Sequence, residues 1–227
     1  MNQWNQQARE TLKGSDQSNE FFNSQAFKEA KFPIKIPLAY AKLIDKNNPN
    51  DPLLKQVMPQ VTNKNTDYVL SPLNDEDNSP VNGLIHKYPS RVLLITSQVC
   101  AIHCQYCFRQ NLDYTAHDAL SNWPEIENYI AKDANINEVI LSGGDPLSLS
   151  DEKLEKLIKN IENFQHVTTL RIHSRSIVVI PSRISDYLVK ILAKTRLKVV
   201  LVTHINHANE ISDEFSKNIA KIENVTL

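Results

Sequence analysis

Short aliphatic segments alternate with amphipathic segments of helical period from Arg91 to the end of the chain. An aliphatic run of strand length suits a strand buried on both faces, and an amphipathic run suits a helix packed against it. The predicted strands are 92–96, 138–142, 169–173 and 197–203, and the predicted helices are 124–132, 151–163, 183–193 and 210–221, with Ser150 and Ser182 as N-caps of the second and third helices. Right-handed crossovers join such strands in parallel, so the alternation predicts an α/β fold with helices outside a parallel sheet.

This alternation leaves two architectures open, a doubly wound sheet and an arc of a (β/α) barrel. In both of them the chemistry lies at the carboxyl ends of the strands. Val225, Thr226 and Leu227 have the pattern of a fifth strand. A domain does not ordinarily end on an unpaired hydrophobic edge, so we expect the chain to be incomplete at the C-terminus.

The first part of the chain has a different character. Residues 1–60 are rich in Asn, Gln and Lys, and their weak helical period predicts short helices over 4–13, 24–31 and 38–45. Prolines among polar residues make 61–90 typical of a long connecting segment. We therefore expect a mainly helical N-terminal extension over 1–60, a connection over 61–90 and a core over 91–227.

Composition and charge exclude several classes of protein. A net charge of −1 argues against binding to nucleic acid through phosphate neutralisation. No stretch approaches the roughly 20 apolar residues that span a bilayer, and the N-terminus has no apolar signal-peptide segment. We therefore expect a cytoplasmic protein without a nucleic acid or membrane partner, and homo-oligomer formation stays open. Thiols stay reduced in the cytoplasm, so cysteines there are typically metal ligands or catalytic groups.

All three cysteines of the chain, Cys100, Cys104 and Cys107, follow directly after the first predicted strand. Thiolates at such short spacing select an iron–sulfur cluster, zinc or Cu(I). A four-iron cluster usually takes four thiolates, so three would leave one iron with an open position for a chelating substrate. A structural zinc site, with His103 or His117 as fourth ligand, is the alternative.

Polar motifs also end the next three predicted strands. Residues 142–146 read Ser-Gly-Gly-Asp-Pro and hold two of the four glycines of the chain, which suits close approach of a ligand to the backbone, although a simple turn would also explain them. Residues 171–175 and 203–207 place cationic and polar side chains at the following strand ends. Such side chains suit an anionic, multidentate cofactor, or they cap the helices that follow.

The C-x3-C-x2-C spacing after the first strand of a βα array resembles the signature of radical S-adenosylmethionine (SAM) enzymes. Residues 87–94, 100–109, 141–147, 170–175 and 203–210 together resemble the lysine 2,3-aminomutase family, and the resemblance covers roughly residues 30–227. Within the family, residues 107–109, 171–175 and 204–210 are most similar to members that serve elongation factor P. The resemblance implies a partial (β/α) barrel of the radical SAM type, incomplete at the C-terminus.

The resemblance also implies a reaction. A [4Fe-4S] cluster and SAM supply a 5′-deoxyadenosyl radical, and pyridoxal 5′-phosphate (PLP) carries the migrating amino group of L-lysine. The product, (R)-β-lysine, is then attached to elongation factor P by a partner ligase. The radical chemistry belongs to the cofactors, and the protein supplies position and exclusion of water.

Site residues follow from the same resemblance. It assigns Cys100, Cys104 and Cys107 to the cluster, and Arg109 to the substrate carboxylate, for which a planar guanidinium is suited. It assigns SAM to Gly143, Gly144, Asp145, Ser174 and His204. It assigns PLP to Lys87, Tyr88 and Arg91, although Arg91 could instead be an ordinary residue at the start of a strand.

One departure from the family stands out. The lysine that anchors PLP, and the aspartates that bind the ε-amine of the substrate, are expected beyond Leu227. We therefore expect this chain to be inactive on its own. Two alternatives remain: a radical SAM enzyme without PLP, against which residues 87–91 argue, and a non-enzymatic, zinc-stabilised βα module that binds protein.

Overall fold

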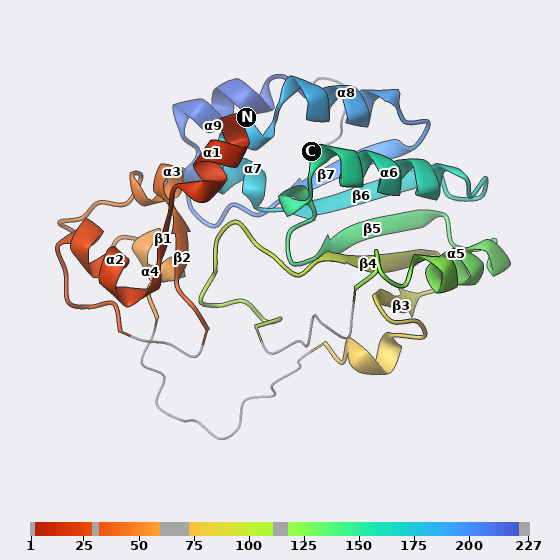
Figure 1. The fold of residues 1–227 in the computed structure, drawn as a ribbon, viewed down its shortest axis with the longest axis horizontal. Coiled ribbons are helices and arrows are strands. Elements are labelled where there is room, and N and C mark those ends of the chain that lie inside the picture. Colours follow the sequence, from red (N-terminus) through yellow and green to blue (C-terminus); the bar gives the residue numbers. More distant parts are fainter. Residues whose placement is uncertain (1–2, 29–31, 60–72, 111–117, 223–227) are drawn as a thin grey trace.

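The computed structural model of the 227-residue chain describes residues 3–28, 32–59, 73–110 and 118–222. Its main feature is a five-stranded sheet with the order β3-β4-β5-β6-β7 (Figure 1). The strands are β3 (Leu84–Tyr88), β4 (Arg91–Ser97), β5 (Glu138–Gly143), β6 (Thr169–Ser174) and β7 (Lys198–Thr203). The four predicted strands are therefore present, and they pair in parallel.

The strand order decides between the two architectures. In the described part of the chain each parallel strand lies beside the next one in sequence, and the order never reverses. A doubly wound sheet reverses its order at a switch point, whereas a barrel adds strands in one direction. The fold is therefore a partial α/β barrel, as predicted. The predicted fifth strand at residues 225–227 lies outside the described residues.

The predicted helices that cover the sheet are present with shifted ends. They are α5 (Trp123–Lys132), α6 (Asp151–Glu162), α8 (Asp186–Lys194) and α9 (Asp213–Ile219). Ser150 caps α6 as predicted, because its side chain accepts from the Lys153 backbone N–H. Ser182 as the cap of α8 is wrong: Pro181 starts a separate 3₁₀ turn, η3 (Pro181–Arg183), and Ser185 caps the helix.

Two short elements explain the remaining shifts. Between β6 and η3 the chain forms α7 (Ser176–Val179), which the sequence did not predict. Before α9 it forms η4 (Ala208–Glu210), so that helix begins at Asp213 rather than at residue 210, with Ser212 as its cap. Both elements lie at the carboxyl ends of strands: α7 brings the backbone N–H of Ser176 to the site described below, and η4 brings the side chain of Glu210.

The N-terminal extension is less helical than predicted. Its elements are α1 (Gln3–Arg9), β1 (Thr11–Lys13), α2 (Gly14–Phe22), β2 (Lys35–Pro37), α3 (Leu38–Ala41) and α4 (Leu54–Val57). β1 pairs antiparallel with β2, which ends the first helix early. The helix predicted at 24–31 is wrong over residues 24–28, where Asn19 binds the backbone of Phe27 through both its amide atoms, and 29–31 lie outside the described residues.

The predicted connection over 61–90 contains structure as well. Residues 76–78 form the 3₁₀ turn η1 (Glu76–Asn78), and β3 pairs antiparallel with β4. Buried side chains of the N-terminal extension, such as Tyr40 and Leu53, belong to one hydrophobic core with those of the sheet and its helices. The boundaries at 60 and 90 stay predictions.

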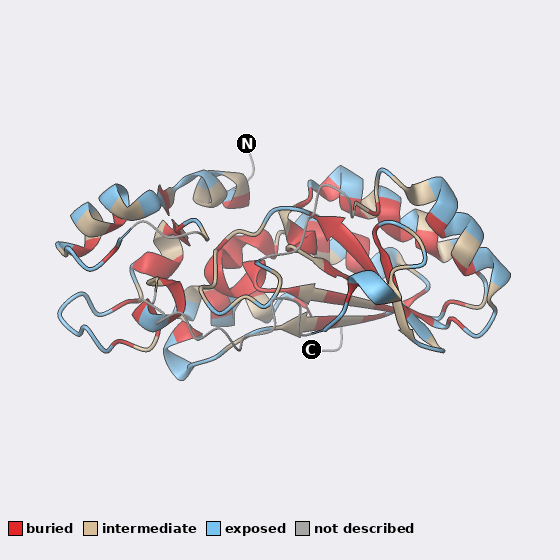
Figure 2. Cartoon of the chain, turned by 90° about the horizontal axis from the view of Figure 1, so that it is seen from below, coloured by how far each residue is buried: buried red, intermediate tan, exposed pale blue. Residues whose placement is uncertain are grey.

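Burial separates the two faces of the sheet. Val92 and Leu94 of β4 are fully buried beneath the helices, and the helices turn their exposed residues outward (Figure 2). The other face carries residues of mixed burial, among them Leu93, Arg171 and His173. The N-terminal extension lies beyond the carboxyl ends of the parallel strands (Figure 1). Among the described residues, no helix has the length and apolarity to cross a membrane.

Candidate functional site

The cysteine loop leaves the carboxyl end of β4, as the sequence predicts. Cys100, Cys104 and Cys107 are half-buried free thiols. The loop is held from the N-terminal extension: the Lys35 side chain donates to the Cys100 carbonyl over 2.6 Å, and the Gln105 backbone N–H donates to the Gln56 carbonyl over 2.9 Å. The extension therefore shapes the loop, which the sequence did not indicate.

The environment of the thiols fits a group that carries positive charge. Burial, followed by the charges of Asp145, Cys107 and Cys104, raises the pKa of the Cys100 thiol to about 12. Burial also raises the pKa of Cys107, and Cys104 adds to this effect. Thiols with raised pKa values become thiolates only beside a positive charge, and a bound metal ion or iron–sulfur cluster supplies one.

The zinc alternative requires a fourth ligand beside the three cysteines. Within the described ranges, no group of three or more His, Cys, Asp or Glu side chains is gathered as a metal site. A four-iron cluster binds each thiolate through a different iron, so its ligands need not meet at one point. His103, a candidate fourth zinc ligand, stacks on Phe32, and its Nδ1 lies 2.8 Å from the Pro33 carbonyl. His117, the other candidate, lies outside the described residues.

The two glycines of residues 142–146 allow the end of β5 to lie against the start of the cysteine loop. Gly143 has a φ of +102°, and a Cβ on it would come within 2.7 Å of the Ile95 side chain. A Cβ on Gly144 would lie 2.7 Å from the Ser97 carbonyl oxygen and 2.9 Å from that of Val99. Close packing of the backbone therefore requires these glycines, and their contact with SAM stays a prediction.

Asp145 and Ser174 connect the ends of two neighbouring strands. The buried Asp145 carboxylate accepts hydrogen bonds from Ser174 Oγ (2.7 Å) and from the backbone N–H groups of Arg175, Ser176 and Leu147 (2.8–2.9 Å). These protein donors hold the end of β5 to the end of β6. The predicted contact between Asp145 and SAM would have to be made in addition to these bonds.

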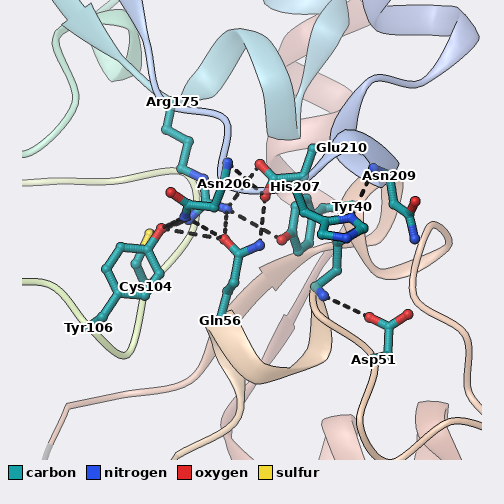
Figure 3. Close-up of polar contacts among 11 residues, drawn as sticks. Tyr40, Asp51, Gln56, Cys104, Tyr106, Arg175, Asn206, His207, Asn209 and Glu210 are labelled. Atoms are coloured by element: carbon teal, nitrogen blue, oxygen red, sulfur yellow. Dashed lines mark hydrogen bonds and ion pairs between the residues drawn. The ribbon is translucent and has the colours of Figure 1, made fainter.

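Arg175 brings the cysteine loop together with the end of β6 (Figure 3). Its Nη1 lies 2.7 Å from Cys104 Sγ and 2.7 Å from the Tyr106 hydroxyl. Its Nη2 faces Gln56, Tyr40 and the fully buried Glu210. His204, which the sequence assigned to SAM, is exposed and meets the edge of the Tyr106 ring.

A second cluster joins Lys87 and Arg109, two residues that the sequence assigned to different ligands. Asp75 pairs with Lys87 Nζ at 2.9 Å and with Arg109 Nε at 3.0 Å. Arg109 Nη1 also lies 3.4 Å from Ser142 Oγ, at the end of β5. Burial alone would raise the pKa of the Asp75 carboxyl, but Lys87 and Arg109 outweigh it and lower the pKa below its ordinary value.

Tyr88 and Arg91 lie elsewhere. They pair with each other where β3 turns into β4, at the amino end of the parallel strands. Arg91 contacts Glu138 (3.3 Å), which also binds Arg171 (2.7 Å), and the Tyr88 side chain is 63% exposed. These contacts fit the alternative of a residue at the start of a strand, and the PLP roles of Tyr88 and Arg91 stay predictions.

The sheet face opposite the helices is cationic. Burial lowers the pKa of His173 on this face, and the charges of Arg171 and Arg109 lower it further. Lys87 and Arg91 also carry positive charge here. The carboxylates of Asp75 and Glu138 neutralise part of it. A surface of this kind suits anionic groups such as phosphate and carboxylate.

Sequence reasoning missed several residues that hold the site together. Lys35 and Gln56 bind the cysteine loop from the N-terminal extension. Tyr106 of the loop, together with Tyr40, Gln56 and Glu210, binds Arg175. Asp75, which joins the two cations, falls in the predicted connecting segment. The sequence carried one usable signal, because Arg175 and Glu210 belong to the segments that resemble the aminomutase family.

Comparisons with known proteins agree with this site. The family described as "4Fe-4S single cluster domain" matches residues 90–180, which contain the cysteine loop, β5 and β6. An L-lysine 2,3-aminomutase of Buchnera aphidicola subsp. Baizongia pistaciae is 42% identical over 207 residues, covering 88% of this chain and 61% of the relative. The L-lysine 2,3-aminomutase of Escherichia coli K12 is 38% identical over 200 residues, covering 86% and 57%.

A third relative extends the match over nearly the whole chain. The L-lysine 2,3-aminomutase of Haemophilus influenzae is 40% identical over 225 residues, covering 95% of this chain and 65% of the relative. The chain thus spans about three fifths of the length of these curated relatives, from 57% to 65%. Together with the partial barrel and the cysteine loop at its carboxyl edge, these identities show that the chain belongs to the lysine 2,3-aminomutase family.

Proposed function

We propose that the protein is a radical SAM lysine 2,3-aminomutase, an isomerase that converts L-lysine to (R)-β-lysine with a [4Fe-4S] cluster, SAM and PLP. One observation carries the proposal: a chain of this family bears its three cysteines on a single loop at the carboxyl edge of a parallel sheet. Carboxyl edges are where α/β barrels bind their ligands. When bound, the cluster and SAM supply a carbon radical, and PLP carries the amino group that migrates.

The residues of this chain divide the work of binding. Cys100, Cys104 and Cys107 hold the cluster. Arg109 holds the carboxylate of lysine, since Asp75 on its Nε and Ser142 near its Nη1 fix the plane of the guanidinium. Lys87 forms an ion pair with the same Asp75 carboxylate, so it is close enough to Arg109 for both cations to bind one anion.

The end of β5 and the end of β6 form the other side of the site. Gly143 and Gly144 let the end of β5 pack against β4 and the cysteine loop, so that a cofactor held by this loop would lie next to them. Asp145 and Ser174 fix the relation between the two strand ends, and SAM binds beside them and His204. The cationic face of the sheet, with Lys87, Tyr88 and Arg91 along β3 and β4, receives the phosphate of PLP.

Two finer parts of the proposal concern the cell. The protein acts in the cytoplasm, and its β-lysine is attached to elongation factor P by a ligase. The similarity of residues 171–175 and 204–210 to members that serve elongation factor P supports this part. Mass spectrometry of elongation factor P from cells with and without the gene tests it, and an unchanged β-lysyl content would contradict it.

The central test is cluster binding by the full chain. After anaerobic reconstitution we expect about four irons per chain and, after reduction by dithionite, an EPR signal that SAM alters. Replacing Cys104 by Ala removes one of three thiolates and abolishes the change on adding SAM. Stoichiometric zinc with no uptake of iron would reject the proposal.

Lysine conversion is measured separately. Because the chain spans about three fifths of its relatives, this assay uses a protein of their full length, with lysine, SAM, PLP and dithionite. Chromatography then detects β-lysine. A protein that binds the cluster and cleaves SAM, but leaves lysine unchanged, would be a radical SAM enzyme of another kind.

A further inference from the structure

Arg175 occupies a position that the proposed function does not explain. Its side chain is 8% exposed and lies between the cysteine loop and the N-terminal extension (Figure 3). We propose that Arg175 is a positioning residue for the iron–sulfur cluster: it donates to Cys104 Sγ and sets the reduction potential, while Glu210 and the N-terminal extension hold its guanidinium in place. This inference rests on the proposed cluster.

The guanidinium is divided into two sides. Nη1 faces the loop, with Cys104 Sγ and the Tyr106 hydroxyl each at 2.7 Å. Nη2 faces away from the loop, toward Gln56 Oε1 (2.5 Å) and Glu210 Oε2 (3.3 Å). The negative charge of Glu210 therefore lies on the side of the guanidinium away from Cys104 Sγ, and the positively charged Nη1 faces the sulfur.

Glu210 is itself fixed by other groups. It is fully buried, and its Oε1 accepts from Gln56 Nε2 at 2.6 Å and from the Asn206 backbone N–H at 3.3 Å. Gln56 Oε1 also accepts from Asn206 Nδ2 at 2.8 Å. Apart from Arg175 Nε, which is buried without a partner, the charged atoms of this pair have hydrogen-bond partners. Such a pair is held in place, because a displacement would leave a desolvated charge without a partner.

The N-terminal extension supplies part of this shell. Tyr40 of α3 lies 3.3 Å from Nη2, and its ring centre is 5.5 Å from the guanidinium carbon. Gln56 of α4 binds the guanidinium through its side chain and the cysteine loop, at Gln105, through its backbone carbonyl. The extension therefore contacts both the loop and the residue that faces Cys104 Sγ.

A cation that donates to a cluster sulfur changes the electron affinity of the cluster. Reduction adds one negative charge, which a nearby positive charge stabilises, and hydrogen bonds to sulfur act in the same direction. Removing the cation should therefore lower the midpoint potential. Removing its counter-charge should raise it.

Three variants of the full chain test these opposite shifts by EPR-monitored redox titration. Glu210→Gln keeps the hydrogen-bonding shape and removes the counter-charge, so the potential should rise. Arg175→Met combined with E210Q removes both charges and leaves no buried ion alone. At a fixed applied potential, the ratio of reduced to oxidised cluster should be about tenfold smaller in this double variant than in E210Q. For a one-electron couple this means a midpoint potential that is lower by about 59 mV. Arg175→Lys keeps the charge but loses the fork, and its potential should lie between those of wild type and the double variant.

Arg171→Lys is the matched control, because Arg171 lies on the same strand but pairs with Glu138 at its amino end. It should leave the potential unchanged. The inference is overturned if E210Q and the double variant both keep the wild-type midpoint potential. It is also overturned if R171K shifts the midpoint potential as much as those two variants do. If the double variant fails to fold, as judged by circular dichroism, then E210Q and R175K decide the matter by the same criterion.

Failure of this inference is distinguishable from failure of the proposed function. A wild-type chain that takes up no iron refutes the proposed cluster. A wild-type chain that loads normally, beside variants with unchanged potentials, refutes only the role of Arg175. A folded double variant that cannot retain iron, while R171K retains it, supports positioning of Cys104 by Arg175.

Discussion

Asp75 is expected to stabilise the protein through the two cations that it joins, and Asp75→Asn tests this. The side chains of Asp75 and Arg109 are only 7% and 11% exposed, so the hydrogen bond between them is a charged bond shielded from water. Such a bond contributes about 1.5–3 kcal/mol. Lys87 is 24% exposed, and its pair adds about 1 kcal/mol or less. Because Asn keeps one acceptor oxygen, we expect D75N to lower the free energy of unfolding by about 2–3 kcal/mol.

The assay is urea unfolding followed by circular dichroism, with Asp77→Asn as the control. Asp77 is exposed and lies two residues away in the same turn, η1, so D77N should stay within about 0.5 kcal/mol of wild type. Equal unfolding midpoints for D75N and D77N would refute the idea that the bridge between Lys87 and Arg109 stabilises the fold.

The effect of D75N on the free energy of unfolding should depend on pH, and the lowered pKa of Asp75 determines the direction. The pKa of Asp75 is lowered in the folded state, so its contribution is complete above the unfolded value of about 3.9 and is lost as pH falls through the folded pKa. The difference in stability between wild type and D75N should therefore be constant from pH 8 to about pH 5 and shrink below about pH 4. A difference that grows on acidification would contradict the lowered pKa.

Three further predictions concern other residues. Gly144→Ala places a Cβ 2.9 Å from the Val99 carbonyl oxygen of the cysteine loop and 2.7 Å from that of Ser97 at the end of β4. It should therefore cost about 1–3 kcal/mol and reduce iron loading, measured by urea unfolding and iron analysis. Normal loading would show that the loop adjusts. Arg109→Lys keeps the charge and loses the fork, so kcat/KM for lysine should fall at least about tenfold with the cluster spectrum unchanged. Loss of the spectrum would show a structural role instead. Arg183→Met leaves Asp151, its partner at 2.8 Å, buried without a counter-charge, so it should cost about 3–5 kcal/mol in urea unfolding, and adding Asp151→Asn should recover part of that.

Local pattern was sufficient for the core of the fold. The four parallel strands and the helices α5, α6, α8 and α9 each show their period within a dozen residues or so, and each was predicted with its type. The prediction of secondary structure failed where the local sequence pattern was overridden by neighbouring chain, either a distant strand or a preceding proline. Residues 11–13 continue a helical pattern but pair with β2, and Ser182 has the chemistry of an N-cap but follows Pro181 into a separate turn.

The cysteine loop was predicted because its three cysteines are close neighbours in sequence. Cys100, Cys104 and Cys107 need only a short loop to come together, and residue type with spacing is enough to indicate a thiolate site. The same holds for Gly143 and Gly144 at the end of β5, because both positions that have no room for a Cβ lie in one short segment. In both cases the chemistry and the geometry come from the same few residues.

The groups that support the loop could not be found in this way. Arg175 meets Gln56 across 119 residues of sequence and Tyr40 across 135, and Asp75 meets Arg109 across 34. No periodicity or spacing connects such positions, because only the packing of the N-terminal extension against the strand ends brings them together. The sequence determined which residues bear the chemistry of the loop. The tertiary structure decided which charges face them, since that depends on distances through space.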